Sequence, residues 1–245
     1  MQATIIIPAR YESVRFPGKP LADRTGRPLI QHVHERVSTV AGVNRVIVAT
    51  DDARIRSVVE AFGGEVVMTR RDHPNGTSRI AEVAARLEDS LIVNVQGDEP
   101  EIDPTVIEGA VESLIEHPEC VMSTLAAPFE HDEDPADPNM VKVVLDHDSR
   151  ALYFSRALIP HNRDGERGTP PLRHVGLYVY RRDFLLKYIM LPPTPLESAE
   201  KLEQLRVLEH GFRISVARVK HACQGIDTPE QYDAFVRRYL ATSAG

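Results

Sequence analysis

The 245-residue chain contains no tryptophan and only two cysteines, Cys120 and Cys223. Because neither cysteine belongs to a Cys-x-x-Cys pair, the sequence excludes a disulfide framework and indicates no structural zinc site. We expect both thiols to be ordinary buried side chains. The chain also lacks any apolar run of about 20 residues, the length that a membrane-spanning helix needs.

Positive charge is also scarce, because 29 lysines and arginines stand against 36 acidic residues and leave a net charge of −7. This balance argues against nucleic acid as a partner. An apolar strand expected at residues 4–9 begins too early to leave room for a signal peptide. We therefore expect a soluble, cytoplasmic protein without a membrane partner.

Strand-like apolar runs alternate with amphipathic stretches in the first half of the chain, a pattern typical of a mainly parallel sheet covered by helices. The length allows one large α/β domain with a lobe, or two small domains. The expected strands are residues 4–9, 43–50, 65–69, 91–95 and 121–126, and the expected helices are 29–40, 53–62, 78–89 and 104–116.

The second half begins with an acidic, proline-rich connection over residues 128–140. Beyond it we expect paired strands at 140–146 and 151–156, a polar loop at 160–173, a strand at 174–180, a helix at 195–210 and a strand at 213–219. A terminal helix should follow, with Thr228 as its N-cap and Pro229 in its first turn.

A basic loop leaves the carboxyl end of the first expected strand. It carries Arg10, Arg15 and Lys19. In open α/β sheets ligands bind at the carboxyl ends of the strands, and three cations on one short loop suit a polyanion such as a triphosphate. Gly18 would allow the backbone to approach phosphate oxygens closely.

Two further segments also follow expected strands. Asp98 lies just beyond the strand at 91–95, where a carboxylate suits Mg²⁺, which binds one or two carboxylates together with substrate phosphates. Residues 75–79 lead into a helix whose N-terminus could hold a base edge or a phosphate. Ser78 has the alternative role of capping that helix.

Several ordered strings carry a resemblance to one family. They are Ile-Ile-Pro-Ala-Arg-Tyr-x-Ser-x-Arg-x-Pro-Gly-Lys-Pro-Leu, Asn-Val-Gln-Gly-Asp-Glu-Pro, Tyr-Phe-Ser-Arg-Ala, Arg-His-Val-Gly-Leu-Tyr, Leu-Glu-Gln-Leu-Arg-x-Leu-Glu and Gly-Ile-Asp-Thr-Pro-Glu. Over residues 4 to about 235 the chain resembles the 3-deoxy-manno-octulosonate (Kdo) cytidylyltransferases, also called CMP-Kdo synthetases.

The resemblance implies a nucleotide-diphospho-sugar-transferase-like α/β fold, with a mainly parallel, Rossmann-like sheet flanked by helices. Residues 1–245 would form a single catalytic domain, in which a smaller lobe at about 127–190 contributes to the sugar site and to a homodimer. The implied reaction joins CTP to Kdo, giving CMP-Kdo and diphosphate for lipopolysaccharide synthesis. The anomeric hydroxyl would attack the α-phosphate in line, with Mg²⁺ as cofactor.

The resemblance also implies roles for individual residues. The expected catalytic residues are Arg10, Lys19, Asp98 and Asp227, of which Asp98 and Asp227 would hold the metal. The expected nucleotide-binding residues are Pro8, Ala9, Arg10, Ser13, Arg15, Lys19, Arg70, Asn75, Gly76, Thr77 and Arg79. The expected Kdo-binding residues are Gln96, Arg156, His174, Tyr178, Glu203 and Gln204. Ser78 stands where the family more often has an acidic residue.

Three other functions compete with this interpretation. One is a cytidylyltransferase for another acidic sugar, such as a sialic acid or an 8-amino analogue of Kdo. Another is a metal-dependent glycosyltransferase that uses Asp51 and Asp52, although its diphosphate donor would leave the three-cation loop unexplained. The last is a nucleotide-binding module without catalysis, which the complete set of candidate residues disfavours.

Overall fold

The computed structural model describes residues 3–13, 15–163, 165, 168–222 and 225–243. Its contacts divide the chain into two compact units, which are treated separately below. The first unit combines Met1–Thr105 with Cys223–Gly245, and the second is Val106–Ala222. The lobe expected at about 127–190 falls within the second unit. Cys120 is buried as expected, whereas Cys223 lies outside the described residues.

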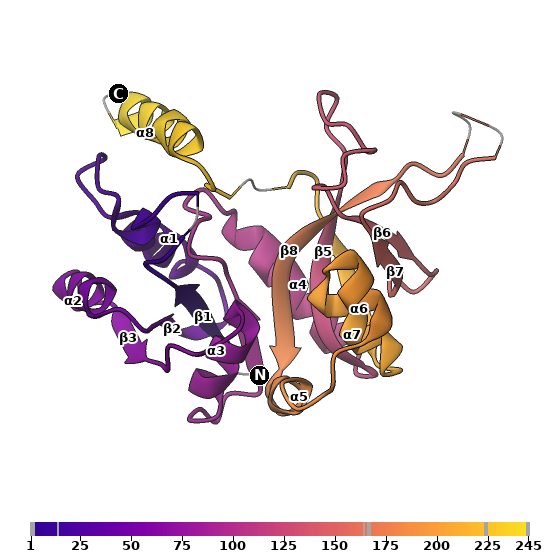
Figure 1. Cartoon of the computed structure of the whole chain (residues 1–245), viewed down its shortest axis with the longest axis horizontal. Helices are drawn as coiled ribbons and strands as arrows, with labels where there is room; N and C mark the ends of the chain where they lie inside the picture. The colour runs from indigo at the N-terminus through magenta and orange to yellow at the C-terminus, as the bar shows by residue number, and fades with distance from the viewer. Residues whose placement is uncertain (1–2, 14, 164, 166–167, 223–224, 244–245) are drawn as a thin grey trace. The chain divides into compact units, whose positions relative to one another are not determined.

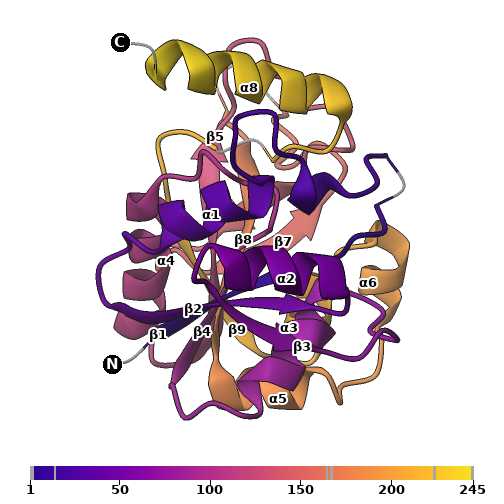
Figure 2. The ribbon, with the colours of Figure 1, turned by 90° about the vertical axis from the view of Figure 1, so that its left-hand side faces the viewer.

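The first unit alternates strands with helices, as the sequence predicted. Its elements are β1 (Ala3–Ala9), the 3-10 helix η1 (Lys19–Leu21), α1 (Leu29–Val37), β2 (Val43–Thr50), α2 (Ala53–Ala61), β3 (Glu65–Met68), α3 (Gly76–Ala84), β4 (Leu91–Asn94) and α8 (Pro229–Ser243). The four strands are all parallel, in the order β3-β2-β1-β4. Figures 1 and 2 show α1 and α2 on one side of these strands and α3 on the other.

The central strand β1 fixes where a ligand should bind in this unit. Its middle residue Ile6 pairs with Ile47 of β2 on one side and Asn94 of β4 on the other. The chain moves outward from β1 to β3 and then returns to β4, so β1 and β4 border a topological switch point. Ligands of open α/β sheets bind at such a point, outside the carboxyl ends of the strands.

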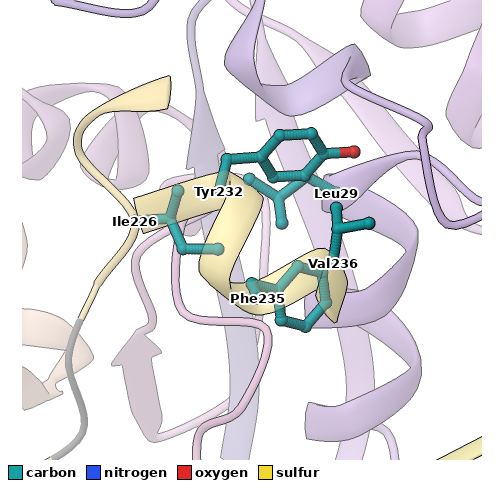
Figure 3. Packing of buried hydrophobic residues seen from close by; sticks show 5 residues of the cluster. All are labelled: Leu29, Ile226, Tyr232, Phe235 and Val236. Atoms are coloured by element: carbon teal, nitrogen blue, oxygen red, sulfur yellow. The ribbon is translucent and has the colours of Figure 1, made fainter. Parts of the chain in front are cut away.

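Helix α8 joins the first unit through a small apolar cluster (Figure 3). Tyr232, Phe235 and Val236 of this helix pack with Ile226 and with Leu29 of α1, and all five are buried. As predicted, α8 begins with Thr228 as its N-cap, whose Oγ1 accepts a hydrogen bond from Gln231 N at 3.3 Å. The cluster therefore fixes the segment that precedes α8 against the first unit.

The second unit contains antiparallel as well as parallel strands. Its elements are most of α4 (Pro104–Glu116), then β5 (Cys120–Pro128), β6 (Lys142–Leu145), β7 (Ala151–Ser155), β8 (Leu172–Arg181), α5 (Arg182–Tyr188), α6 (Pro195–Glu200), α7 (Glu203–Glu209) and β9 (Arg213–Arg218). β5 pairs parallel with β9 and antiparallel with β8. β6 pairs antiparallel with both β7 and β8, so the expected hairpin is present.

The expected single helix at 195–210 is wrong, because the chain forms α6 and α7 instead. Between them Lys201 adopts a left-handed conformation with φ of 53°. A β-carbon makes this conformation unfavourable, so contacts outside the helix must stabilise it. These contacts involve Glu200 and are described below.

Smaller corrections concern helix ends. α1 stops at Val37 rather than at residue 40, and α3 covers 76–84 rather than 78–89. α3 begins earlier because Asn75, not Ser78, is its N-cap and accepts from Ser78 N at 2.9 Å. The short helix α5 was not predicted. Within the described residues, no helix is long and apolar enough to cross a bilayer.

Candidate active site

The basic loop after β1 is held in a defined turn. Gly18 has a φ of 72°, and its N–H donates to Tyr11 O at 2.9 Å. Glycine adopts this left-handed conformation without steric cost, so the turn itself explains the glycine. Within this turn, the ring of Phe16 lies 5.6 Å from that of Tyr232 in α8. The loop is thus held both by its own backbone bond and by contact with α8.

Lys19 directs its ammonium group inward rather than toward solvent. Its Nζ donates to Asp98 Oδ2 at 2.6 Å and to the backbone oxygen of Ile226 at 2.6 Å. It also lies 3.6 Å from Asp227 Oδ1. Lys19 is 9% exposed, so these oxygens replace the water that a surface lysine would bind. One ammonium group therefore lies close to both candidate metal ligands.

Backbone contacts bring the two carboxylates together from distant parts of the sequence. Ile226 N donates to Asp98 O at 2.8 Å, which ties the segment before α8 to the loop after β4. A β-carbon on Gly97 would lie only 3.2 Å from Pro8 O, so this loop passes directly against the end of β1. Arg15 Nη2 pairs with Asp227 Oδ2 at 3.1 Å, on the solvent side.

A cavity of about 300 Å³ opens beside this cluster, at the carboxyl ends of β1 and β4. Its lining comes from the end of β1 and its loop, from the start of α3 and from the loop after β4: Pro8, Ala9, Arg10, Glu12, Ser13, Lys19, Pro20, Asn75, Gly76, Gln96, Gly97 and Asp98. The start of a helix attracts negative charge. The cavity thus combines cations and a helix N-terminus with a carboxylate.

Arg10 lies between this cavity and a neighbouring one. The second cavity has a volume of about 250 Å³ and is lined also by Asp51, Asp52 and Arg54. Arg10 Nη2 donates to His73 O at 2.6 Å. Burial, and then the nearby charge of Arg79, lower the pKa of Arg10. An anion beside this guanidinium would relieve that repulsion.

Some expected nucleotide-binding residues lie elsewhere. Arg79 is fully buried, with Nη2 3.2 Å from Asp51 Oδ2 and Nη1 bonded to Thr69 Oγ1. Arg70 is exposed and approaches Glu82 at 3.5 Å. Thr77 is buried within α3. Together with Arg15, these residues are outside the lining of the 300 Å³ cavity.

Asp51 and Asp52, the pair that a glycosyltransferase would use, are engaged by cations. Asp51 pairs with the buried Arg79. Asp52 is the N-cap of α2 and bonds Arg54 Nη2 at 2.6 Å. The hydrogen bond from Arg54 lowers the pKa of Asp52 to about 2. Because this pair already stabilises the fold, the structure does not favour the glycosyltransferase interpretation.

The charge cluster around Asp98 also affects its neighbour. Glu99 is buried, and desolvation followed by the charge of Asp98 raises its pKa to about 8. Glu99 is therefore a neutral acid at neutral pH. Asp98 lines the cavity and Glu99 does not, so Asp98 is the better placed of the two to bind a cation.

The donor set fits Mg²⁺ better than a metal that needs many protein ligands. Among the described residues, no group of three or more His, Cys, Asp or Glu side chains is arranged to hold a metal. Asp98 and Asp227 instead provide two carboxylates, whose hard oxygen atoms both lie near the Lys19 ammonium group. Mg²⁺ typically binds one or two carboxylates and completes its shell with phosphates and water. The residues present are compatible with such a site.

Five of the six expected sugar-binding residues belong to the second unit, and Gln96 belongs to the first. In the second unit, His174 Nε2 bonds Thr124 Oγ1 at 2.9 Å, and its ring lies 5.6 Å from that of Tyr178. Tyr178 OH donates to Gln204 Oε1 at 3.2 Å. Burial lowers the pKa of His174 to about 3 and raises that of Tyr178. Both side chains are consequently neutral.

The same cluster holds a buried amide donor. Gln204 Nε2 is buried and has no hydrogen-bond partner among the described residues. A ligand oxygen would satisfy it, because an unpaired buried donor is costly. Its neighbour Glu203 accepts from Tyr188 OH through its backbone oxygen at 3.1 Å. No local pattern points to Thr124, because its contact with His174 spans 50 positions.

Arg156, the remaining candidate, is fixed by backbone oxygens. Its Nε donates to Glu200 O at 2.7 Å and its Nη1 to Pro138 O at 2.8 Å. Glu200 is three positions before Glu203, so Arg156 is tied to the same α6–α7 junction that carries Glu203 and Gln204.

Comparisons with known proteins agree with this geometry. The profile of the cytidylyltransferase family matches residues 4–214. The 3-deoxy-manno-octulosonate cytidylyltransferase of Syntrophotalea carbinolica is 55% identical over 238 residues, covering 94% of this chain and 95% of the relative. That of Solibacter usitatus is 48% identical and covers 97% of this chain and 94% of the relative.

A solved structure is similar over the same length. It is that of CMP:2-keto-3-deoxy-manno-octonic acid synthetase in complex with CTP. The match has a TM-score of 0.94 and 44% identity, covering 99% of this chain and all of the other (100%). The similarity therefore extends through both units.

Proposed function

Because this chain belongs to the 3-deoxy-manno-octulosonate cytidylyltransferase family, we propose that it joins CTP to Kdo and releases CMP-Kdo and diphosphate. The single observation that carries the site assignment is the buried Lys19 ammonium group shared by Asp98 and Asp227. This cluster lies beside the cavity at the carboxyl ends of β1 and β4, where the fold class binds ligands.

The first unit binds the nucleotide. Arg10 and Lys19 are the cations of the cavity lining, and Asn75 and Gly76 place the start of α3 there. These groups together suit a triphosphate. Arg79 supports the pocket from inside through Asp51, and Arg15 holds Asp227. In this assignment, Pro8, Ala9 and Ser13 contribute shape and hydrogen bonds at the cavity wall.

The carboxylates of Asp98 and Asp227 hold Mg²⁺. Bound there, the ion would neutralise phosphate charge and acidify a coordinated hydroxyl. In the reaction, the anomeric oxygen of Kdo attacks the α-phosphorus, the bond from the α-phosphorus to the oxygen that bridges to the β-phosphate breaks, and the hydroxyl proton passes to solvent water. Negative charge grows on the departing diphosphate, where Arg10 and Lys19 stabilise it.

The second unit binds the sugar acid. Arg156 is the cation suited to its carboxylate, because a guanidinium forms paired bonds with a carboxylate. The neutral His174 and Tyr178, with Glu203 and Gln204, suit sugar hydroxyls. Gln96, which we also expect to bind Kdo, lines the cavity of the first unit. Neutral side chains are appropriate here, since hydroxyl groups need donors and acceptors rather than charge.

We also propose that the chain acts as a homodimer. The second unit exposes apolar side chains that a partner surface would cover, among them Leu152 at 60% and Leu158 at 50% exposure. Sedimentation velocity at micromolar concentration measures the assembly directly. A single species with the mass of one chain would contradict the dimer.

Diphosphate release from a matrix of nucleotides and sugar acids tests the proposed reaction. The nucleotides are CTP, UTP and ATP, and the acids are Kdo, its 8-amino analogue and a sialic acid, each assayed with and without Mg²⁺. We expect release only with CTP, Kdo and Mg²⁺. If turnover is faster with the 8-amino analogue or the sialic acid, that acid rather than Kdo is the substrate. Diphosphate release without any acid would exclude the transfer reaction.

A further inference from the structure

Arg156 is held by more contacts than its position at the end of β7 requires. A free arginine side chain loses considerable rotamer entropy when a ligand immobilises it. Here three segments of the second unit already restrict the residue: the connection at Asp137 and Pro138, strand β6 and the end of α6. The residues that supply these contacts, Glu200 and Lys142, were not among the expected site residues.

Glu200 contacts the Ser155–Arg156 segment in three ways. Its Oε1 accepts from Ser155 Oγ at 2.7 Å and its Oε2 from Arg156 N at 2.9 Å. Its backbone oxygen accepts from Arg156 Nε at 2.7 Å. The Glu200 carboxylate therefore fixes the backbone of Arg156, and the Glu200 carbonyl fixes the Nε end of the guanidinium, which is called its inner edge below.

The break between α6 and α7 makes the last of these bonds available. In a continuous helix, the Glu200 oxygen would accept from the N–H four positions later. The left-handed Lys201 ends α6 at Glu200, and this oxygen bonds Arg156 instead. The contact with Arg156 thus accounts for a break that has no glycine or proline to cause it.

Lys142 fixes Arg156 through a second contact, to its backbone oxygen. It is fully buried, at 0% exposure, which is rare for a lysine. Its Nζ donates to Arg156 O at 2.6 Å and to Asp137 O at 3.0 Å. The next residue in that connection, Pro138, accepts from Arg156 Nη1. One buried ammonium group therefore ties the backbone of Arg156 to the segment that also contacts its guanidinium.

These contacts engage only part of the guanidinium. Nε and one Nη1 N–H are satisfied by carbonyl oxygens, and no described residue is a partner of Nη2. A planar guanidinium with its inner edge fixed presents the remaining N–H groups in a set direction, which is what a carboxylate ligand needs.

We propose that Glu200 and Lys142 are positioning residues that hold Arg156 in the orientation that binds the carboxylate of the sugar acid. This inference rests on the proposed role of Arg156 as the ligand of that carboxylate. Neither residue needs to touch the substrate. Both act by removing alternative conformations of Arg156 before the sugar acid binds.

A double-mutant cycle with steady-state kinetics tests the inference. The variants are Glu200→Ala, Arg156→Ala and the double variant, and the readouts are KM for Kdo and KM for CTP. We expect Glu200→Ala to raise KM for Kdo roughly 10-fold or more, because misplacing a binding group by about 1 Å is costly, and to leave KM for CTP within about twofold. In the Arg156→Ala background, Glu200→Ala should have no further effect on KM for Kdo.

Glu209→Gln is the matched control. The Glu209 carboxylate also supports α6, accepting from Leu196 N at 3.0 Å and Glu197 N at 3.2 Å, but it does not contact Arg156. It should change KM for neither substrate. Glu200→Gln keeps an acceptor for Arg156 N and should recover most of the loss in Glu200→Ala, as a positioning role requires.

Lys142→Met gives a second measurement, since it keeps the length of the side chain and removes its donors. We expect it to raise KM for Kdo selectively, with the same dependence on Arg156. If either variant raises both KM values equally, or acts undiminished without Arg156, the positioning role is wrong. If Arg156→Ala itself leaves KM for Kdo unchanged, the proposed sugar contact fails instead, and the two failures are therefore distinguishable.

Discussion

Lys19 Nζ lies 2.6 Å from Asp98 Oδ2, in a part of the first unit where the lysine is almost completely buried. The pair joins the loop after β1 to the loop after β4, across the switch point of the sheet. The same ammonium group approaches Asp227. The positive charge of Lys19 therefore offsets the negative charges of the two carboxylates. Without it, these carboxylates would repel each other and the phosphates of a nucleotide.

Replacing Asp98 by Asn should lower turnover by roughly 10²-fold, since it removes a charged ligand worth about 3 kcal/mol in the transition state. Diphosphate release at saturating CTP and Kdo measures this effect across a range of Mg²⁺ concentrations. Asp103→Asn is the control, because Asp103 accepts from Thr105 N at 2.9 Å and lies outside the cavity lining. Normal turnover of Asp98→Asn at high Mg²⁺ would contradict the metal assignment.

Lys19→Met should make the fold more dependent on magnesium. Without the ammonium group, Asp98 and Asp227 repel each other, and we expect a loss of about 1–3 kcal/mol, below the value for fully buried pairs because Asp227 is 45% exposed. Mg²⁺ that binds both carboxylates would offset the loss by mass action. Thermal unfolding of the wild type and of Lys19→Met, each in EDTA and in Mg²⁺, measures this dependence. If Mg²⁺ raises the Tm of both proteins equally, the result argues against a metal site shared by the two carboxylates.

His174 should make the protein less stable in acid. Burial lowers its pKa to about 3, below the value of about 6.5 in an unfolded chain. The unfolded state therefore binds the proton more readily, and stability falls as the pH drops below about 6.5. Between pH 7.5 and 4.5, the wild type should lose about 3 kcal/mol more than His174→Gln in urea unfolding. Parallel pH profiles would show that His174 does not cause the loss.

Phe235→Ala should destabilise the first unit by about 3 kcal/mol, because the ring is 2% exposed and its loss leaves a cavity in the cluster with Leu29. Leu240→Ala in the same helix is the control, since Leu240 is 50% exposed. Its effect should stay within about 0.5 kcal/mol. Similar losses in both variants would contradict the prediction, because the loss would then not depend on burial of the side chain.

The sequence was most informative where one local signal determined the structure. The β-branched run at 43–50 became β2 with the same bounds, and Thr228 and Pro229 began α8 as expected. Arg10, Lys19 and Asp98 each followed a buried strand, and parallel strands bring their carboxyl ends to one edge of the sheet. Local patterns therefore indicated Arg10, Lys19 and Asp98, which all line the cavity, whereas the family resemblance supplied Pro8, Ala9, Ser13 and Gln96.

The remaining features depend on contacts between distant residues. Nothing near Lys201 predicts the end of α6, because the contact that uses the freed carbonyl comes from Arg156, 44 positions earlier. Lys142 stands in a valine-rich strand, where alternation predicts a solvent-facing lysine. It is buried because Arg156 O and Asp137 O replace water. Such acceptors have no signature in the local sequence.

The dependence of Lys19 on Ile226 has a consequence for biosynthesis. The bond between them spans 207 positions, and the second unit lies between the two parts of the first in the sequence. A ribosome must therefore make the whole second unit before the segment that carries Asp227 exists. Until α8 docks on Leu29, a nascent chain holds Lys19 and Asp98 without their third charged partner. The proposed nucleotide site would therefore be completed late in translation, after the strands of both units have been synthesised.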